Sequence, residues 1–204
     1  NIRGNLRTAQ RLLKAAGYRI VDNKLISPKS GQPVSFEILL VSPAFERIVT
    51  PFAANLKRLG IDANVRTVDQ SQYINRLRDF DYDMIVASFG QSESPGNEQR
   101  DYWSSDAADR PGSRNVIGIR NPAVDALIEK IVDAPDRAGL VAATRALDRV
   151  LLWNHYVIPQ WHVGNDRIAY WDKFGIPKHP KYGVDVMSWW VDPAKAAAIE
   201  RERR

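Results

Sequence analysis

The sequence predicts an α/β fold in which helices flank a mostly parallel β-sheet. Three short runs, 34–41, 61–68 and 82–89, are apolar, favour β-structure and have the length of strands. Segments with the spacing of amphipathic helices lie between these runs, and the connections are short. Alternating strands and helices with short connections imply parallel strands joined by right-handed crossovers. We therefore expect an α/β layer over most of residues 1–163.

Three helices are predicted in the first half of the chain. Residues 5–16 place apolar side chains on one face and arginine and lysine on the other, and Gly17 supplies the left-handed residue that often ends a helix. In the second helix, 45–59, Pro51 lacks a backbone donor, so the helix either kinks there or restarts with Pro51 as its first residue. Asp69, with a glutamine three residues later, has the spacing of a capping box and begins the third helix.

A helical hairpin is predicted in the second half. Asn121 and Pro122 suit the N-cap and the first position of a helix, and apolar residues then recur at helical spacing. A second helix is expected over residues 136–154, and both helices are expected to pack against the sheet. The run 156–163 is a candidate for a further strand.

Residues 164–204 differ in composition from the rest. Tryptophan, tyrosine and phenylalanine are frequent up to residue 193, but they are mixed with glycine, proline and lysine and show little periodicity. Large aromatic side chains need a surface to bury against, because each removes a large apolar area from water. We therefore expect 1–163 to form one α/β domain and 164–204 to pack on a domain outside this chain.

The composition excludes several classes of protein. No stretch approaches the ~20 apolar residues that cross a bilayer, and the absence of cysteine excludes disulfides, thiolate metal sites and a cysteine nucleophile. The net charge of +5 is spread along the chain, which favours a mildly basic surface over a nucleic-acid interface. The polar first residues show no signal peptide, and because the chain starts with Asn1 rather than Met we expect a processed product or a fragment.

Motifs for catalysis and for cofactor binding are missing from the sequence. Neither GxxxxGK[ST] nor GxGxxG follows a predicted strand, GxSxG and HExxH do not occur, and the three histidines are too scattered to mark a metal site. We therefore expect no cofactor and no metal. Glu93 and Glu98 flank the turn SPGN and could serve as acid and base, so an α/β hydrolase is kept as an alternative. A second alternative is a basic nucleic-acid-binding module that uses the stretch WDKFGIPKHPKYG.

The segment 88–115 is the strongest candidate for a ligand site. It follows the third strand, and ligands of open parallel sheets bind beyond the carboxyl ends of the strands. Long loops in compact domains are usually functional or disordered, and aromatic residues argue against disorder; a surface insertion or a partly helical connector is the alternative. Polar side chains beside aromatic ones suit a flexible polar ligand such as a peptide. The predicted ligand-binding residues are Phe89, Gln91, Ser92, Glu93, Asn97, Trp103 and Asn115, together with Trp161.

The ordered set LLKAAGY, LKRLGIDANVRTV, YDMIVASF, NPAVDALI and VIPQWH resembles the C-terminal lobe of the family 5 extracellular solute-binding proteins. These are the large peptide- and nickel-binding receptors of ABC importers. The resemblance covers roughly residues 5–165, and it rests on the order of the motifs rather than on any single one. SPGNEQRDYWSS and the aromatic tail look most like the subgroup linked to uptake of oligopeptides and microcin C-type peptide antibiotics.

The resemblance implies a two-lobed periplasmic receptor that is not an enzyme. Such a receptor closes on a peptide or peptide-like ligand and delivers it to an ABC permease in the inner membrane. On this view residues 1–163 form a periplasmic-binding-protein-like lobe, and 164–204 form the return segment that packs on the missing N-terminal lobe. An isolated lobe is then expected to bind ligand weakly, because half of the cleft is missing.

The sequence departs from the resemblance at one functional position. Many peptide binders of this family carry a tryptophan at the end of the third strand and an aspartate three residues later. The aspartate lies four residues before a proline and receives the ammonium group of the peptide. Counting back four residues from Pro95 places Gln91 at the aspartate position and Ser88 at the tryptophan position. Phe89 is a candidate replacement for the aromatic ring, and Glu93 for the charge. Recognition of a free peptide amino terminus is therefore not carried over to this chain.

Overall fold

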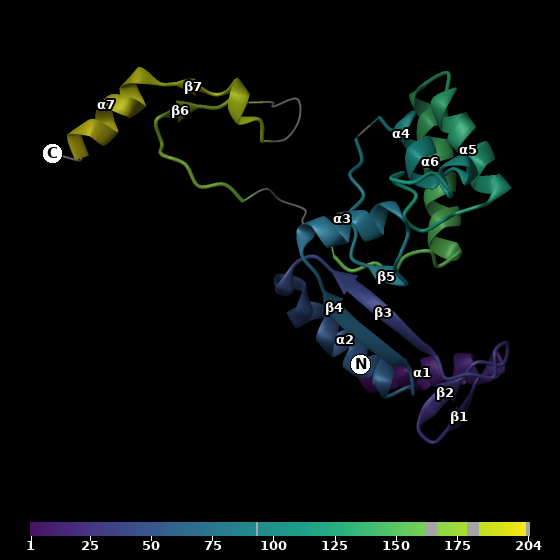
Figure 1. The fold of residues 1–204 in the computed structure, drawn as a ribbon. Helices are drawn as coiled ribbons and strands as arrows, with labels where there is room; N and C mark the ends of the chain where they lie inside the picture. Colours follow the sequence, from purple (N-terminus) through teal and green to yellow (C-terminus); the bar gives the residue numbers. More distant parts are fainter. Residues whose placement is uncertain (93, 162–166, 179–183, 203–204) are drawn as a thin grey trace. The chain divides into compact units, whose positions relative to one another are not determined.

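The computed structural model of the 204-residue chain describes residues 1–92, 94–161, 167–178 and 184–202 (Figure 1). The chain divides into two compact units, residues 1–157 and residues 158–204. The elements of the first unit are α1 (Ile2–Ala15), β1 (Arg19–Val21), β2 (Lys24–Ile26), β3 (Ser35–Leu40), η1 (Pro43–Phe45), α2 (Glu46–Lys57), β4 (Asp62–Thr67), α3 (Gln70–Arg78), β5 (Met84–Ile85), α4 (Glu98–Trp103), η2 (Ser105–Ala107), α5 (Pro122–Val132) and α6 (Arg137–Trp153). Those of the second unit are β6 (Phe174–Gly175), η3 (Val186–Ser188), β7 (Trp190–Val191) and α7 (Pro193–Glu202).

A parallel sheet of order β4–β3–β5 forms the centre of the first unit. Ile38 of β3 is opposite Val65 of β4 on one side and Met84 of β5 on the other. Helix α2 packs along β4, and its Val49 is buried against the sheet face that carries Ile38 and Leu40 (Figure 1). The predicted α/β class, with a parallel sheet and flanking helices, is confirmed.

Local sequence signals explain where most helices begin and end. The Asp69 carboxylate accepts a hydrogen bond from the backbone N–H of Gln72, and Gly17 has the left-handed φ of 88° predicted after α1. Asn121 and Asp136 cap α5 and α6 in the same way. Pro51 lies inside α2, which begins at Glu46, so of the two alternatives for this helix the restart at Pro51 is wrong.

The third strand is much shorter than predicted. Only Met84 and Ile85 of the expected run 82–89 pair with β3. Beyond Ile85 residues 86–89 form no strand: Val86 still packs on the sheet cluster, and Phe89 packs against Tyr102 and Trp103 of α4. Within the predicted strand 156–163, residues 156–161 form no strand, and 162 and 163 lie outside the described residues.

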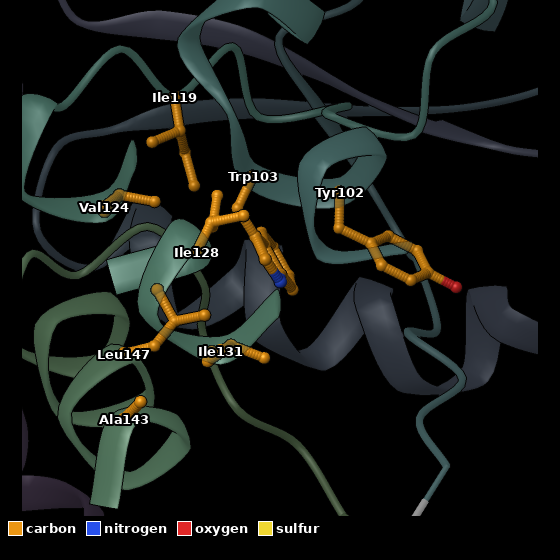
Figure 2. Packing of buried hydrophobic residues seen from close by; sticks show 8 residues of the cluster. All are labelled: Tyr102, Trp103, Ile119, Val124, Ile128, Ile131, Ala143 and Leu147. Carbon is orange, nitrogen blue, oxygen red and sulfur yellow. The ribbon is translucent and has the colours of Figure 1, made fainter. Parts of the chain in front are cut away.

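The helical hairpin of α5 and α6 is present, but it builds a core of its own (Figure 2). That core joins the hairpin to Tyr102, Trp103 and Ile119, whereas a separate cluster joins α2 to the sheet. The prediction that the hairpin packs on the sheet is therefore wrong. The physical reason is that segment 88–115, which contains α4 and η2, supplies the apolar surface that the hairpin covers.

One close approach requires a glycine. Gly60, at φ 81°, ends the turn after α2, and its carbonyl accepts a hydrogen bond from the backbone N–H of Leu25 in β2 at 2.8 Å. A Cβ at this position would lie 2.7 Å from that same nitrogen. The β1–β2 hairpin therefore docks beside the start of β4 only because residue 60 has no side chain.

Candidate functional site

The chain that leaves β5 is held by the short helix α4. We call residues 86–92 the exit loop. The Tyr102 hydroxyl donates a hydrogen bond to the carbonyl of Gly90 at 3.2 Å. The Phe89 ring lies edge-on to Tyr102 and against Trp103, with ring centroids 5.9 and 4.7 Å apart. Because Tyr102 and Trp103 are both buried, they fix the loop from the inside of the domain.

A chain of side-chain hydrogen bonds continues this support to the surface. The Trp103 indole N–H donates to Oε1 of Gln99 at 3.0 Å, and Nε2 of Gln99 donates to Oε1 of Gln91 at 2.7 Å. Gln99 is only 3% exposed, whereas Gln91 is exposed. Both polar ends of the buried amide are therefore satisfied, and the surface amide of Gln91 is held in one orientation.

Beside the exit loop lies a pocket of about 420 Å³. Its walls are the loop, α4 and one side of α6, and most of its surface is apolar. The lining residues are Phe89, Gln91, Ser92, Pro95, Gln99, Trp103, Ile117, Arg137, Leu140, Val141, Thr144, Arg145, Leu147, Asp148, Leu151, Leu152, Tyr156 and Val157. An apolar hollow with a few polar groups at its rim is typical of a binding site for a small organic ligand.

Four of the eight predicted site residues meet in this pocket. Phe89 and Trp103 form part of its apolar wall, and Gln91 and Ser92 belong to its exposed edge. Glu93 lies outside the described residues. Trp161 is 60% exposed and belongs to the second unit.

The other two predicted residues have structural contacts instead. Asn97 precedes α4, and its Oδ1 accepts a hydrogen bond from Arg100. Asn115 is fully buried: its Nδ2 donates to the carbonyls of Ser104 and Ile119, and its Oδ1 accepts from the N–H of Ile119. Asn115 therefore ties Ser104, between α4 and η2, to Ile119 in the chain before α5. It has no exposed surface for a ligand.

Charged groups attach α4 to the hairpin. Arg100 forms a forked pair with Glu129 of α5, and this pairing holds the pKa of Glu129 below its ordinary value. At the end of α4, the N–H and hydroxyl of Ser105 donate to Asp125 at 2.8 and 2.6 Å. The helix that carries Tyr102 and Trp103 is thus attached to α5 from within, at Arg100, and just after its end, at Ser105.

Glu98 has the character of an anchoring carboxylate. Burial acts to raise the pKa of Glu98, but hydrogen bonds from the backbone N–H groups of Gly96 and of Glu98 itself, and from the Gln99 amide, lower it below its ordinary value. A group that stays ionised at neutral pH is a poor general acid. The described side chains also include no group of three or more carboxylates or imidazoles placed to hold a metal ion.

Sequence reasoning missed Gln99 and the α6 side of the pocket. The available signal was the four-residue spacing of Gln99 and Trp103, which lets the two side chains meet on a helix. The spacing did not lead to a helix prediction, because α4 is only six residues long and shows no repeated pattern. The apolar residues of α6 were predicted as hairpin core, and Leu140 and Leu151 in fact both pack on that core and line the pocket.

A family profile, that of the bacterial extracellular solute-binding proteins, family 5 Middle, matches residues 1–111. The chain belongs to family 5 of the bacterial extracellular solute-binding proteins. Two relatives of this family 5 chain match almost all of it. Protein y4wM of Sinorhizobium fredii is 56% identical over 94% of this chain and 29% of its own length. The probable peptide-binding protein YejA of Agrobacterium fabrum is 50% identical over 94% of this chain and 32% of its own length.

A solved structure supports the same fold. The oligopeptide-binding protein AppA from Bacillus subtilis, in complex with a nonapeptide, has a TM-score of 0.66 and 20% identity over 74% of this chain and 30% of that chain. At this identity the likeness concerns the fold alone. The family 5 chain spans about a third of the length of the curated relatives it matches. Within the parts of the chain that the structure describes, no helix is both long and apolar enough to cross a bilayer.

Proposed function

We propose that this chain is the C-terminal ligand-binding lobe of the substrate-binding component of an ABC importer, and that it binds oligopeptides or peptide-like solutes. The observation that carries the proposal is the pocket beside the exit loop. It lies where the chain leaves the carboxyl end of β5, the position at which parallel sheets bind ligands. The description of the Agrobacterium relative as a probable peptide-binding protein supports a peptide as the ligand.

The chemistry of the pocket suits a side chain of such a ligand. Phe89, Leu140 and Leu151 offer an apolar wall, and Gln91 and Ser92 offer hydrogen-bonding groups at its edge. In our proposal the wall excludes water from an apolar side chain while the polar edge binds the ligand's backbone amides. Because few charged groups line the pocket, affinity in this proposal depends little on the amino-acid sequence of the ligand.

The rest of the cleft belongs, in this proposal, to an N-terminal lobe outside these 204 residues. Large apolar side chains of the second unit, including Trp171, Met187 and Trp190, are 61%, 89% and 53% exposed. Exposed apolar surface of this extent commonly marks an interface. We propose that residues 164–204 pack on that lobe, that the receptor acts in the periplasm, and that it delivers its ligand to an inner-membrane permease.

Capture of peptides from a pool of synthetic oligopeptides, followed by calorimetry with the captured peptide, tests the proposal. The longer protein that contains this chain is compared with the 204-residue chain. We expect the longer protein to bind and the 204-residue chain to bind weakly, because bridging contacts to two lobes are needed. Cleavage of the peptide during incubation would instead favour a hydrolase, and binding of an oligonucleotide that weakens steeply with salt would favour a nucleic-acid-binding module.

A pair of variants tests whether the ligand binds in the pocket. Ser92→Trp puts an indole at the edge of the pocket and should weaken peptide binding by about tenfold or more, which corresponds to about 1.4 kcal/mol. Ser71→Trp, at an exposed position of α3, is the matched control and should bind as the unmodified protein does. Equal affinity in both variants would remove the pocket from the proposed site.

A further inference from the structure

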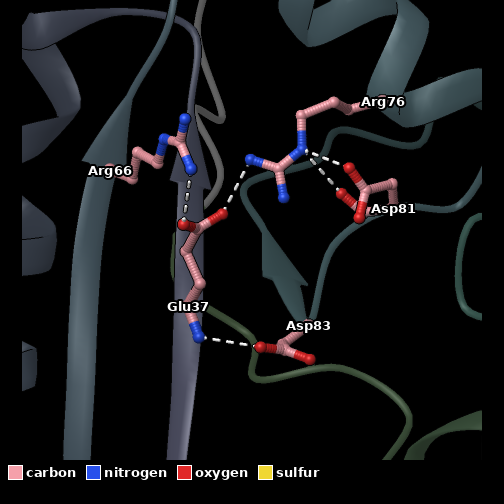
Figure 3. A network of polar contacts seen from close by, with 5 residues as sticks. All are labelled: Glu37, Arg66, Arg76, Asp81 and Asp83. Carbon is pink, nitrogen blue, oxygen red and sulfur yellow. Dashed lines mark hydrogen bonds and ion pairs between the residues drawn. The ribbon is translucent and has the colours of Figure 1, made fainter.

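A charged network lies on the sheet away from the pocket (Figure 3). Arg76 of α3 donates from Nη1 to Oε1 of Glu37 in β3 at 2.8 Å, and from Nε to the carbonyl and carboxylate of Asp81 at 2.9 and 2.8 Å. The backbone N–H of Glu37 in turn donates to the Asp83 carboxylate at 2.8 Å. Arg66 of β4 reaches the other oxygen of Glu37 at 3.5 Å.

This network holds a strand that has little else to hold it. β5 pairs with β3 through Met84 and Ile85 alone, and a two-residue strand at the edge of a sheet forms few ladder hydrogen bonds. Asp83 extends the pairing by one position, since its carboxylate takes the N–H that a longer strand would have bound with a backbone carbonyl. Arg76 then fixes the chain two residues further back, at Asp81.

The arginine is suited to this bridge. A planar guanidinium binds several acceptors at fixed angles, whereas an ammonium group is a point charge. The side chains of Arg76 and Glu37 are only 17% and 24% exposed, so the bond between them is partly sheltered from water, whereas the Asp81 carboxylate is 70% exposed. Both acids raise the pKa of Arg76 further above its ordinary value, which agrees with close pairing.

The position of β5 determines where the exit loop begins. The exit loop follows β5 directly, because it starts at the residue after Ile85. Tyr82, just before β5, donates from its hydroxyl to the carbonyl of Val116 at 2.7 Å, so the start of β5 is also tied to the chain that follows segment 88–115. A shift of β5 along β3 would therefore displace Phe89 and Gln91 at the pocket.

We propose that Arg76 is a positioning residue for the candidate ligand site: by bridging Glu37 and Asp81 it sets the register of β5 on β3 and so fixes the exit loop. The residue contacts no part of the pocket and acts through β5. The proposal rests on the proposed function only in that the exit loop is taken as a ligand contact.

Amide hydrogen exchange on the full 204-residue chain tests this inference without any ligand. In Arg76→Gln, amides in residues 79–91 should exchange about tenfold faster, because hydrogen bonds between charged groups are lost, while α5 and α6 should be unchanged. In Arg76→Lys the exchange rates of these amides should lie between those of the unmodified chain and those of Arg76→Gln, since an ammonium group cannot make the forked contact. Arg120→Gln, which removes an exposed ion pair with Asp109, is the matched control and should leave residues 79–91 unchanged.

Two outcomes would overturn the inference. One is an unchanged exchange rate in residues 79–91 of Arg76→Gln, and the other is an equal rise throughout the first unit, which would make Arg76 a general stabiliser. If Arg76→Gln does not fold, Arg76→Lys and Glu37→Gln carry the same comparison. Loss of peptide binding by the longer protein would refute the proposed function, but it would leave the exchange result standing, so the two failures are distinguishable.

Discussion

The indole N–H of Trp103 donates a hydrogen bond to Oε1 of Gln99, at 3.0 Å, inside the core of the first unit. This bond determines which way the Gln99 amide faces, because its oxygen must point to the indole. Its nitrogen is then directed to Gln91 at the edge of the pocket. A buried side chain thereby orients an exposed one.

Replacing Gln99 by methionine tests this arrangement. Gln99→Met keeps the length of the side chain but leaves the Trp103 N–H without a partner, so we expect a loss of about 1–3 kcal/mol in the free energy of unfolding. Urea denaturation of the 204-residue chain measures it. Gln10→Met, at an exposed position of α1, is the control and should change little. A fully stable Gln99→Met variant would show that the indole finds another acceptor.

Replacing Asn115 is expected to lower the free energy of unfolding more than replacing an exposed asparagine. In Asn115→Ala the N–H and the carbonyl of Ile119 lose their side-chain partner inside the protein, while the Ser104 carbonyl keeps only the bond from the Ala107 N–H, so the free energy of unfolding should fall by on the order of 3 kcal/mol. Asn5→Ala on the surface of α1 should stay within about 0.5 kcal/mol of the unmodified chain. The comparison again uses urea denaturation, and similar losses in both variants would contradict the structural role.

Tyr82 should stay protonated to unusually high pH. Burial and the nearby Tyr73 raise the pKa of Tyr82 to about 12, while an unfolded tyrosine ionises near 10. Since the folded pKa is the higher one, the stabilisation from Tyr82 is present below about pH 10 and is lost as pH rises from about 10 to 12. In an ultraviolet titration of tyrosinate, the component absent from Tyr82→Phe should be the one near pH 12. If the component missing from Tyr82→Phe instead titrates near pH 10, the Tyr82 hydroxyl is not buried enough to raise its pKa.

The attachment of α4 to α5 has a signature at acid pH. In Arg100→Gln, the pKa of Glu129 should rise toward its ordinary value, because the guanidinium that lowers it is gone. The folded pKa of Glu129 is depressed, so the contribution of the pair is present above the unfolded value and is lost as pH falls through the folded one. Carboxyl carbon chemical shifts in an NMR titration report this change. Lys130→Gln, next to Glu129 on α5, is the control and should leave that pKa depressed.

Much of the fold follows from local patterns in the sequence. The spacing of apolar residues predicts β3, β4 and helix α2 between them, and the predicted caps at Asp69 and Asn121 mark helix starts correctly. These features are local, since each depends on residues within a few positions of one another.

The missed features depend on contacts between distant residues. The apolar run after Met84 looks like a strand, but Phe89 pairs with Tyr102 and Trp103 instead of with β3. Asn115 looks like a polar loop residue, and only packing shows that it is buried. Four of the eight predicted site residues, Phe89, Gln91, Ser92 and Trp103, line the pocket because they belong to the segment after the third strand, while none of the α6 wall was predicted.

The exposed edge position of Ser92 offers a practical use. The chain contains no cysteine, so Ser92→Cys would be its only thiol and could carry one environment-sensitive dye at the mouth of the hollow. Occupancy would then change the polarity around the dye and hence its emission. A reagentless optical sensor could in this way report whether a ligand occupies the pocket.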